Sequence, residues 1–135
     1  INVDLKAEVA PLAVATLRRL GAEQQVTLAS FRSSTLRRVR ALGYRGETSL
    51  GRSEVARLLS LPVAAQRGIL APPGRAAQLP VSLAQRWVVA RCHALGLRAD
   101  YWTVNDPIQA RALVALGADG IMTDDPAAIV PAVLG

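Results

Sequence analysis

The sequence has 135 residues, of which 51% are hydrophobic and 19% are charged, a balance that supports one packed domain and excludes an intrinsically disordered chain. Aromatic residues make up only 4%, so the core must be aliphatic. The net charge is +6, and no apolar run approaches the roughly 18 residues that are needed to span a bilayer.

The basic charge comes from fifteen arginines and a single lysine, Lys6. An excess of arginine is typical of nucleic-acid-binding proteins. Here the arginines are spread along expected helices and do not cluster with aromatic side chains that could stack on bases. We therefore interpret most of them as solvated helix faces and expect no nucleic-acid partner, although the charge suits an anionic small-molecule substrate.

The chain opens with INVDLK, which alternates apolar and polar side chains and predicts a strand over residues 1–6. The apolar row comprises Ile1, Val3 and Leu5, and the polar row comprises Asn2, Asp4 and Lys6. The apolar row is expected to pack against helices. The polar row would face either solvent or a functional cavity.

A Leu-Gly pair occurs four times, each after an apolar segment with helical spacing. Glycine just past a helix supplies a left-handed C-cap, so each pair predicts a helix end. The four glycines are Gly21, Gly43, Gly96 and Gly117. Short β-prone runs follow three of the pairs, an order of helix, glycine and strand that is typical of βα units.

Together these patterns predict strands near 1–6, 26–31, 44–49, 98–104 and 119–123. They predict helices near 10–20, 34–42, 53–60, 83–95, 107–116 and 126–134. The strand at 44–49 is the weakest, because Gly46 lies inside it. Ser33 or Ser34, Asp106 and Asp125 are expected to cap helices.

Residues 61–82 are rich in proline and glycine, and we interpret them as an irregular insertion with room for a short strand at 76–79. Long loops in compact domains are more often functional covers than spacers. Five βα units in series imply a parallel sheet. The sheet is either open and doubly wound or part of a closed (β/α)8 barrel, which needs roughly 200 residues when complete.

Four segments resemble the glycerophosphodiester phosphodiesterase family. They are INVDLK, VTLASFRSSTLRRVRALG, YWTVND and LGADGIMTDDP. They occur in the family's order, and from the first to the last they extend over nearly the whole chain. The resemblance implies an α/β fold, a partial (β/α)8 TIM barrel of five parallel βα units, with residues 1–135 forming the C-terminal portion of the barrel domain and the first three strands absent.

The resemblance also implies hydrolysis of a glycerophosphodiester to glycerol phosphate and an alcohol, with a divalent cation, Mg²⁺ or Ca²⁺, holding the phosphate. Asp4 matches a metal-binding position at which the family usually has glutamate. Lys6 matches the family's lysine, which is expected to neutralise charge on the phosphate. The alternative for Asp4 and Lys6 is a solvated ion pair that contributes little.

The residues expected at the substrate are Trp102, Ser30, Phe31 and Asn105. Trp102 matches the family's tryptophan near the barrel mouth, although it could also be a core aromatic residue. Asn105 could bind substrate or satisfy loop backbone. Asp124 and Asp125 are expected to cap a helix rather than to bind a ligand.

The one histidine, His93, lies in a helix expected on the barrel exterior, beside the one cysteine, and we interpret it as structural. The family's two catalytic histidines would lie in strands that this chain lacks. We therefore expect the complete protein to be the enzyme and these 135 residues alone to be inactive. The missing N-terminal half or a second chain is expected to cover the sheet edges.

Three other functions remain open. A catalytically dead relative, used in binding or assembly, would explain aspartate at position 4 and the missing histidines. Another phosphate-handling barrel would show a glycine-rich phosphate loop near the last strands, for which LGADG is too short. A basic nucleic-acid-binding module would bind DNA in a salt-dependent manner.

Overall fold

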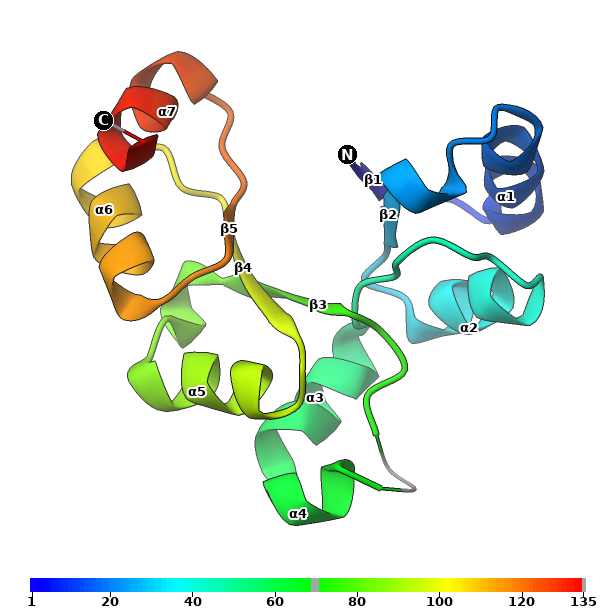
Figure 1. Cartoon of the computed structure of the whole chain (residues 1–135), viewed down its shortest axis with the longest axis horizontal. Helices are drawn as coiled ribbons and strands as arrows, with labels where there is room; N and C mark the ends of the chain where they lie inside the picture. The colour runs from blue at the N-terminus through cyan, green and yellow to red at the C-terminus, as the bar shows by residue number, and fades with distance from the viewer. Residues whose placement is uncertain (69–70, 135) are drawn as a thin grey trace. The chain divides into compact units, whose positions relative to one another are not determined.

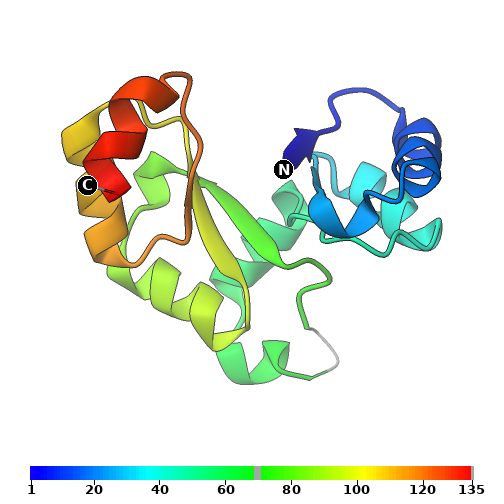
Figure 2. The ribbon, with the colours of Figure 1, turned by 45° about the horizontal axis from the view of Figure 1, so that its top comes forward.

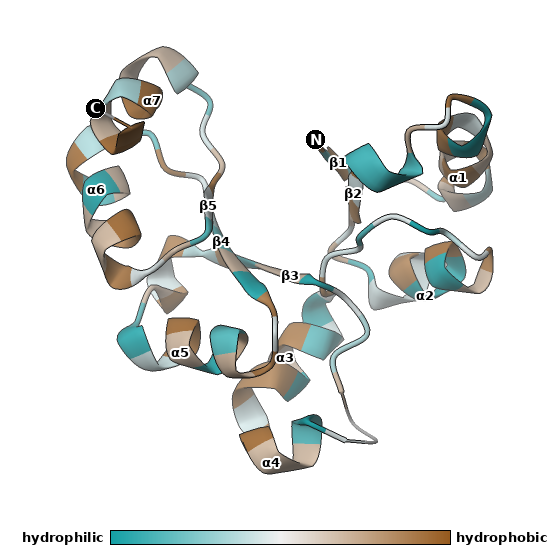
Figure 3. Cartoon of the chain, viewed as in Figure 1, coloured by the Kyte–Doolittle hydropathy of each residue, from teal (hydrophilic) through white to brown (hydrophobic). Residues whose placement is uncertain are grey.

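A computed structural model describes residues 1–68 and 71–134 of the chain. The chain divides into two compact units, one from Ile1 to Ala76 and one that begins at Ala77 (Figure 1). Both are built from helices and parallel strand pairings. Figure 3 shows apolar and polar segments alternating around the helices, as expected where one face is buried and the other meets water.

The first unit contains β1 (Asn2–Asp4), α1 (Ala10–Arg19), the 3-10 turn η1 (Glu23–Gln25), β2 (Thr27–Ala29), α2 (Ser33–Ala41), α3 (Arg52–Ser60) and α4 (Val63–Gln66). Strands β1 and β2 pair in parallel, with Asp4 opposite Ala29. Isolated parallel bridges continue the pairing from Leu28 to Thr48 and from Ser49 to Ala76.

The strand predicted over 44–49 is therefore reduced to the bridges at Thr48 and Ser49. Its first half is held by a side chain instead, because the Tyr44 hydroxyl donates to the Val26 carbonyl at 2.7 Å. A β-carbon on Gly46 would run into the carbonyl oxygen of Glu23, so only glycine fits this approach.

The core of the first unit is aliphatic, as the composition predicts. Its buried cluster consists of Leu5, Ala10, Val14, Val26, Leu28 and Val39. The expectation that all three apolar residues of the first strand pack against helices is wrong for two of them. Leu5 is buried, but Ile1 is 86% exposed and Val3 is 38% exposed. The buried residues of α1, Ala10 and Val14, belong to the same cluster as Leu5, whereas Ile1 and Val3 lie outside that cluster.

The second unit contains β3, which starts at the unit boundary (Ala76–Pro80), the 3-10 turn η2 (Val81–Leu83), α5 (Arg86–Ala94), β4 (Arg98–Trp102), α6 (Pro107–Leu116), β5 (Gly120–Ile121) and α7 (Pro126–Leu134). The sheet order is β3-β4-β5, and Tyr101 of β4 lies opposite Ile121 of β5 in a parallel pair. Figure 2 shows α6 and α7 packed side by side in this unit. No helix in the described part of the chain is long and apolar enough to cross a membrane.

Within the segment interpreted as an insertion, the short strand is confirmed as β3, but α4 and η2 were not predicted. Residues 69–70 of this segment lie outside the described residues. The helix expected from residue 83 begins three residues later, at Arg86, because η2 ends at Leu83 and the backbone of Gln85 is extended.

The predicted helix ends are confirmed. All four glycines of the Leu-Gly pairs have positive φ, at 63°, 70°, 69° and 102° in chain order. Asp106 caps α6, because its carboxylate accepts from the backbone N–H groups of Ile108 and Gln109.

The prediction that Ser33 or Ser34 caps α2 is wrong. The residue before the helix is Arg32, and no side chain caps the helix there. The Ser33 hydroxyl oxygen instead accepts from the N–H and the hydroxyl of Ser53, which ties α2 to α3.

Candidate active site at the carboxyl ends of the strands

Four of the six predicted site residues lie together at one edge of the first unit. Asp4 ends β1 and Lys6 follows it two residues later, while Ser30 and Phe31 directly follow β2. Because β1 and β2 are parallel, their carboxyl ends meet at the same edge. This is the edge at which parallel α/β folds place reacting groups.

Asp4 and Lys6 are both exposed and lie on the strand face opposite the buried Leu5. Among residues 1–68 and 71–134, neither side chain has a hydrogen-bond or ion-pair partner. The alternative that they form an ion pair with each other is therefore wrong for this structure. Both charges are available to a ligand.

Ser30 is 5% exposed and its hydroxyl is already engaged. It donates to the Leu5 carbonyl at 2.8 Å and accepts from the Arg32 N–H at 3.3 Å. Ser30 therefore fixes the segment between Asp4 and Lys6 against the end of β2. Phe31 is 59% exposed beside it and offers an apolar surface at the same edge.

Sequence reasoning missed two charged residues near this edge. The Arg32 guanidinium lies 3.5 Å from the Glu8 carboxylate, and the Thr35 hydroxyl donates to the same carboxylate oxygen. Both partners of the ion pair are more than half exposed, so the pair contributes little to stability. The one feature of the sequence that could have identified Glu8 and Arg32 is their position, since Glu8 lies just after Lys6 and Arg32 just after Phe31.

The other two predicted site residues lie in the second unit, after β4. Trp102 is the half-buried last residue of that strand, and its peptide bond to Thr103 is cis. Asn105 joins the loop after β4 to the loop after β5. Its side-chain oxygen accepts from the Thr123 hydroxyl at 3.0 Å and from the Asp124 N–H at 2.9 Å.

The Asn105 amide nitrogen also donates to the Asp124 carboxylate at 3.1 Å, so most of its hydrogen-bonding capacity is used within the two loops. The expected helix cap is confirmed for Asp125, whose carboxylate accepts from the Ala128 N–H. Asp124 instead contacts Asn105. The expectation that Asp124 also caps this helix is wrong, whereas the Asp-Pro pattern that singled out Asp125 identified the cap correctly.

His93 lies away from this loop edge. Its Nε2 is 2.8 Å from the carboxylate of Asp119, which also accepts from the Ala99 N–H. Asp119 precedes β5 and Ala99 lies near the start of β4, so the contact is at the amino ends of these strands. Such a position in an α/β barrel is associated with stability rather than catalysis.

The neighbouring Cys92 is fully buried, and burial raises the pKa of its thiol to about 11, with smaller contributions from the carboxylates of Asp119 and Asp100. A thiol with this pKa is almost entirely protonated near neutral pH. It is therefore a packed core residue and not a nucleophile.

The described residues do not form a complete cation site. They contain no group of three or more histidine, cysteine, aspartate or glutamate side chains that could hold a metal ion. Asp4 offers one unpaired carboxylate, a ligand that suits Mg²⁺ or Ca²⁺, and Mg²⁺ commonly completes its coordination with water and substrate phosphate. Among the described residues, Asp4 could therefore supply one of the protein ligands to such a cation.

The model of the glycerophosphoryl diester phosphodiesterase family matches residues 2–128 of the chain. No curated protein matches it.

Solved structures of phosphodiesterases match this chain in the order and the arrangement of its helices and strands. A candidate glycerophosphoryl diester phosphodiesterase from Silicibacter pomeroyi has 24% identity and a TM-score of 0.79, over 97% of this chain and 48% of that one. A glycerophosphodiester phosphodiesterase from Parabacteroides distasonis has 18% identity and a TM-score of 0.76, over 98% and 56%.

A phosphodiesterase from Oleispira antarctica, solved with the product sn-glycerol-3-phosphate, has 21% identity and a TM-score of 0.71, over 99% and 55%. At these identities the likeness establishes the fold. The chain spans about half the length of the structures that it matches.

Proposed function

Because the chain belongs to the glycerophosphoryl diester phosphodiesterase family, we propose that the protein containing it hydrolyses glycerophosphodiesters to glycerol phosphate and an alcohol. The observation that carries the proposal is the pair of unpartnered charges, Asp4 and Lys6, at the carboxyl edge of a parallel strand pair. The phosphodiesterase structure with bound sn-glycerol-3-phosphate, which shares this fold, supports the substrate class.

We propose that residues 1–135 supply the C-terminal portion of a (β/α)8 barrel. The parallel pairings and the match to about half of each relative support this proposal. The expected number of five βα units needs one revision, because β3 and α5 form a further strand and helix after the bridge at Thr48 and Ser49.

In this proposal Lys6 acts on the phosphate directly. An ammonium group beside a phosphodiester stabilises the negative charge that grows on the nonbridging oxygens in the transition state. Asp4 would provide one carboxylate ligand for a divalent cation, Mg²⁺ or Ca²⁺, and such a cation would act as a Lewis acid on the phosphate. Asp4 is one methylene shorter than the glutamate usual in the family, so its carboxylate would reach less far from the strand toward a cation.

The substrate-binding proposal divides the remaining residues into two groups. Phe31 in the first unit and Trp102 in the second are each proposed to offer apolar surface to substrate, and Phe31 is the more exposed of the two. Ser30 and Asn105 are largely engaged in hydrogen bonds within their own loops. Each would therefore hold its own loop in shape, with one Asn105 N–H left for substrate.

Hydrolysis also needs proton transfer to the leaving alcohol. His93 is bonded to Asp119 at the amino ends of the strands, so it does not serve this step. We infer that the acid and base come from residues other than those described here, and that the 135-residue chain alone is inactive.

The test is to incubate the complete protein with glycerophosphocholine and glycerophosphoethanolamine and to measure glycerol phosphate release by ³¹P NMR. Activity is expected with Mg²⁺ or Ca²⁺, loss with EDTA, and recovery when the ion is restored. The 135-residue chain, assayed in parallel, is expected to release none.

Two outcomes would contradict the proposal. Turnover by the 135-residue chain would show that no outside residue is needed for proton transfer. Failure of the complete protein to hydrolyse either diester with either ion would favour the alternative, a catalytically inactive relative that binds or assembles. That alternative is motivated by aspartate at position 4 and by the absence of the family's two catalytic histidines from these 135 residues.

A further inference from the structure

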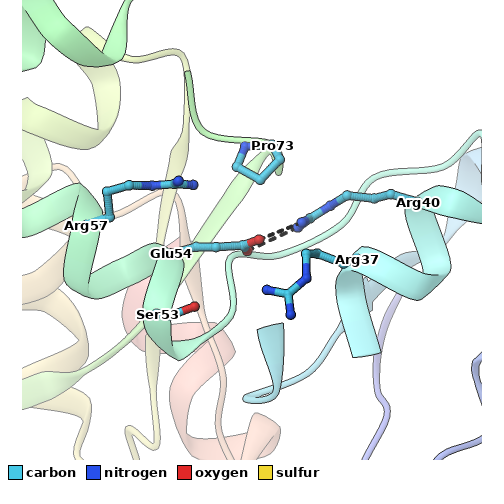
Figure 4. Close-up of a pocket in the computed structure, with 6 residues that line it drawn as sticks. All are labelled: Arg37, Arg40, Ser53, Glu54, Arg57 and Pro73. Carbon is cyan, nitrogen blue, oxygen red and sulfur yellow. Dashed lines mark hydrogen bonds and ion pairs between the residues drawn. The ribbon is translucent and has the colours of Figure 1, made fainter. Parts of the chain in front are cut away.

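A cavity lies in the first unit, between α2 and α3, and none of the proposed site residues lines it. Its volume is about 530 Å³, within the range of small-ligand sites. It is lined by Arg37, Arg40, Ser53, Glu54, Arg57 and Pro73 (Figure 4). Three of these six side chains are arginines and one is acidic, so the wall carries two positive charges in excess.

Glu54 does not offset the excess, because its carboxylate is already paired with Arg40. One oxygen accepts from Arg40 at 2.7 Å, and the other accepts from Arg40 at 3.3 Å and from the Gly51 N–H at 2.8 Å. Arg40 also donates to the Thr48 hydroxyl and to the Ser49 carbonyl. The charges of Arg40 and Glu54 therefore balance each other within the pair.

Arg37 and Arg57 supply the unbalanced charge. Within residues 1–68 and 71–134, neither guanidinium has a hydrogen-bond or ion-pair partner. Figure 4 shows them extending from the two helices into the space around the Arg40–Glu54 pair. Arg57 is only partly exposed, and a cation held partly out of water without a partner is unfavourable unless an anion joins it.

The Ser53 hydroxyl donates to Ser33, so recognition falls to the two guanidinium groups. Each presents a planar set of N–H donors that matches the oxygens of a phosphate, and their combined charge balances a phosphate dianion. We propose that this cavity binds a small phosphate-bearing anion, inorganic phosphate or a phosphate monoester, between Arg37 and Arg57. The proposal stands independently of the proposed hydrolytic function.

Isothermal titration calorimetry of the full chain with inorganic phosphate, at constant ionic strength, tests it. One saturable site is expected, and chloride is expected to give none. Arg37→Gln and Arg57→Gln are each expected to weaken binding by about tenfold, as loss of a charge-assisted pair would. Arg38→Gln is the matched control, because it removes the same charge from an exposed position on α2 that does not line the cavity.

Titration with sn-glycerol 3-phosphate then separates the two sources of the anion. If sn-glycerol 3-phosphate and inorganic phosphate bind with equal affinity, the site recognises the phosphate group alone. If sn-glycerol 3-phosphate binds more tightly, the site prefers a phosphate monoester. Absence of saturable phosphate binding would overturn the proposal, as would equal weakening by Arg38→Gln. Arg37 is exposed, so Arg37→Gln tests the site even if Arg57→Gln fails to fold.

Discussion

Asp4 differs from the other acidic residues of the first unit, because each of them has a hydrogen-bond or ion-pair partner and Asp4 has none in the described part of the chain: these are Glu8, Glu23, Glu47 and Glu54. Lys6 also has no partner there, a property that it shares with several arginines of this unit. Exposed charges without partners contribute almost nothing to stability, so folding does not account for their presence on a strand end. Ser30, by contrast, holds the loop between them through its bond to the Leu5 carbonyl. The residues that would act and the residue that positions them are thus distinct.

Cys92 predicts a pH dependence of stability. Its pKa is raised from 9.0 to about 11 in the folded state by burial. Below pH 9 the thiol is protonated in both states, but between pH 9 and 11 only the unfolded chain releases the proton, so the free energy of unfolding falls as pH rises. The loss is expected to reach up to about 3 kcal/mol.

Urea denaturation at pH 8 and pH 10.5 measures this loss, with Cys92→Ala as the control. The alanine variant retains the raised pKa of Tyr44 and the part of the raised Tyr101 pKa that comes from burial, although it loses the part that the Cys92 thiolate contributes. It therefore still loses stability as pH rises, but less steeply. If the native protein and the variant lose the same free energy over this interval, the buried thiol is not responsible.

At the scale of elements, one ion pair fastens α2 to α3. Arg40 and Glu54 are 20% and 7% exposed, and Arg40 also binds the bridge residues Thr48 and Ser49. Arg40→Met keeps the apolar stem but leaves a buried carboxylate without its cation. We expect it to destabilise the first unit by about 3 kcal/mol.

A double-mutant cycle tests this pair. Glu54→Gln keeps an acceptor for the Gly51 N–H, so the double variant isolates the charge interaction. The coupling energy between Arg40 and Glu54 is expected to exceed about 1 kcal/mol in denaturant unfolding. Additive single effects would mean that the pair does not hold the helices together.

Local signals predicted the elements well where the determinant is local. The glycine that ends each helix and the carboxylate of Asp106 act within a few residues, and both are confirmed. The strand at 44–49 failed because Gly46 packs against Glu23, which is far away in sequence. The Arg40–Glu54 pair was invisible for the same reason, since fourteen residues separate its members.

For the whole molecule, the resemblance to a family named candidate site residues that periodicity, capping signals and composition could not single out. It selected Asp4 and Lys6 from ten acidic and sixteen basic residues. It could not predict that Ile1 and Val3 are exposed, because that depends on how far α1 covers β1. Nor could it predict the engagement of Asn105, which depends on the approach of two loops.

The central claim is that the charged strand end at Asp4 and Lys6 acts on the phosphodiester. The most direct test compares kcat/KM for glycerophosphocholine in the complete protein and in Asp4→Asn, Lys6→Gln and Glu47→Gln. Glu47 is the control, because its exposed carboxylate meets Thr27 at the opposite, amino end of β2.

We expect kcat/KM to fall by at least about 100-fold in Asp4→Asn and in Lys6→Gln, with melting temperatures unchanged, and to stay at the native value in Glu47→Gln. Retention of native kcat/KM by folded Asp4→Asn and Lys6→Gln would contradict the central claim.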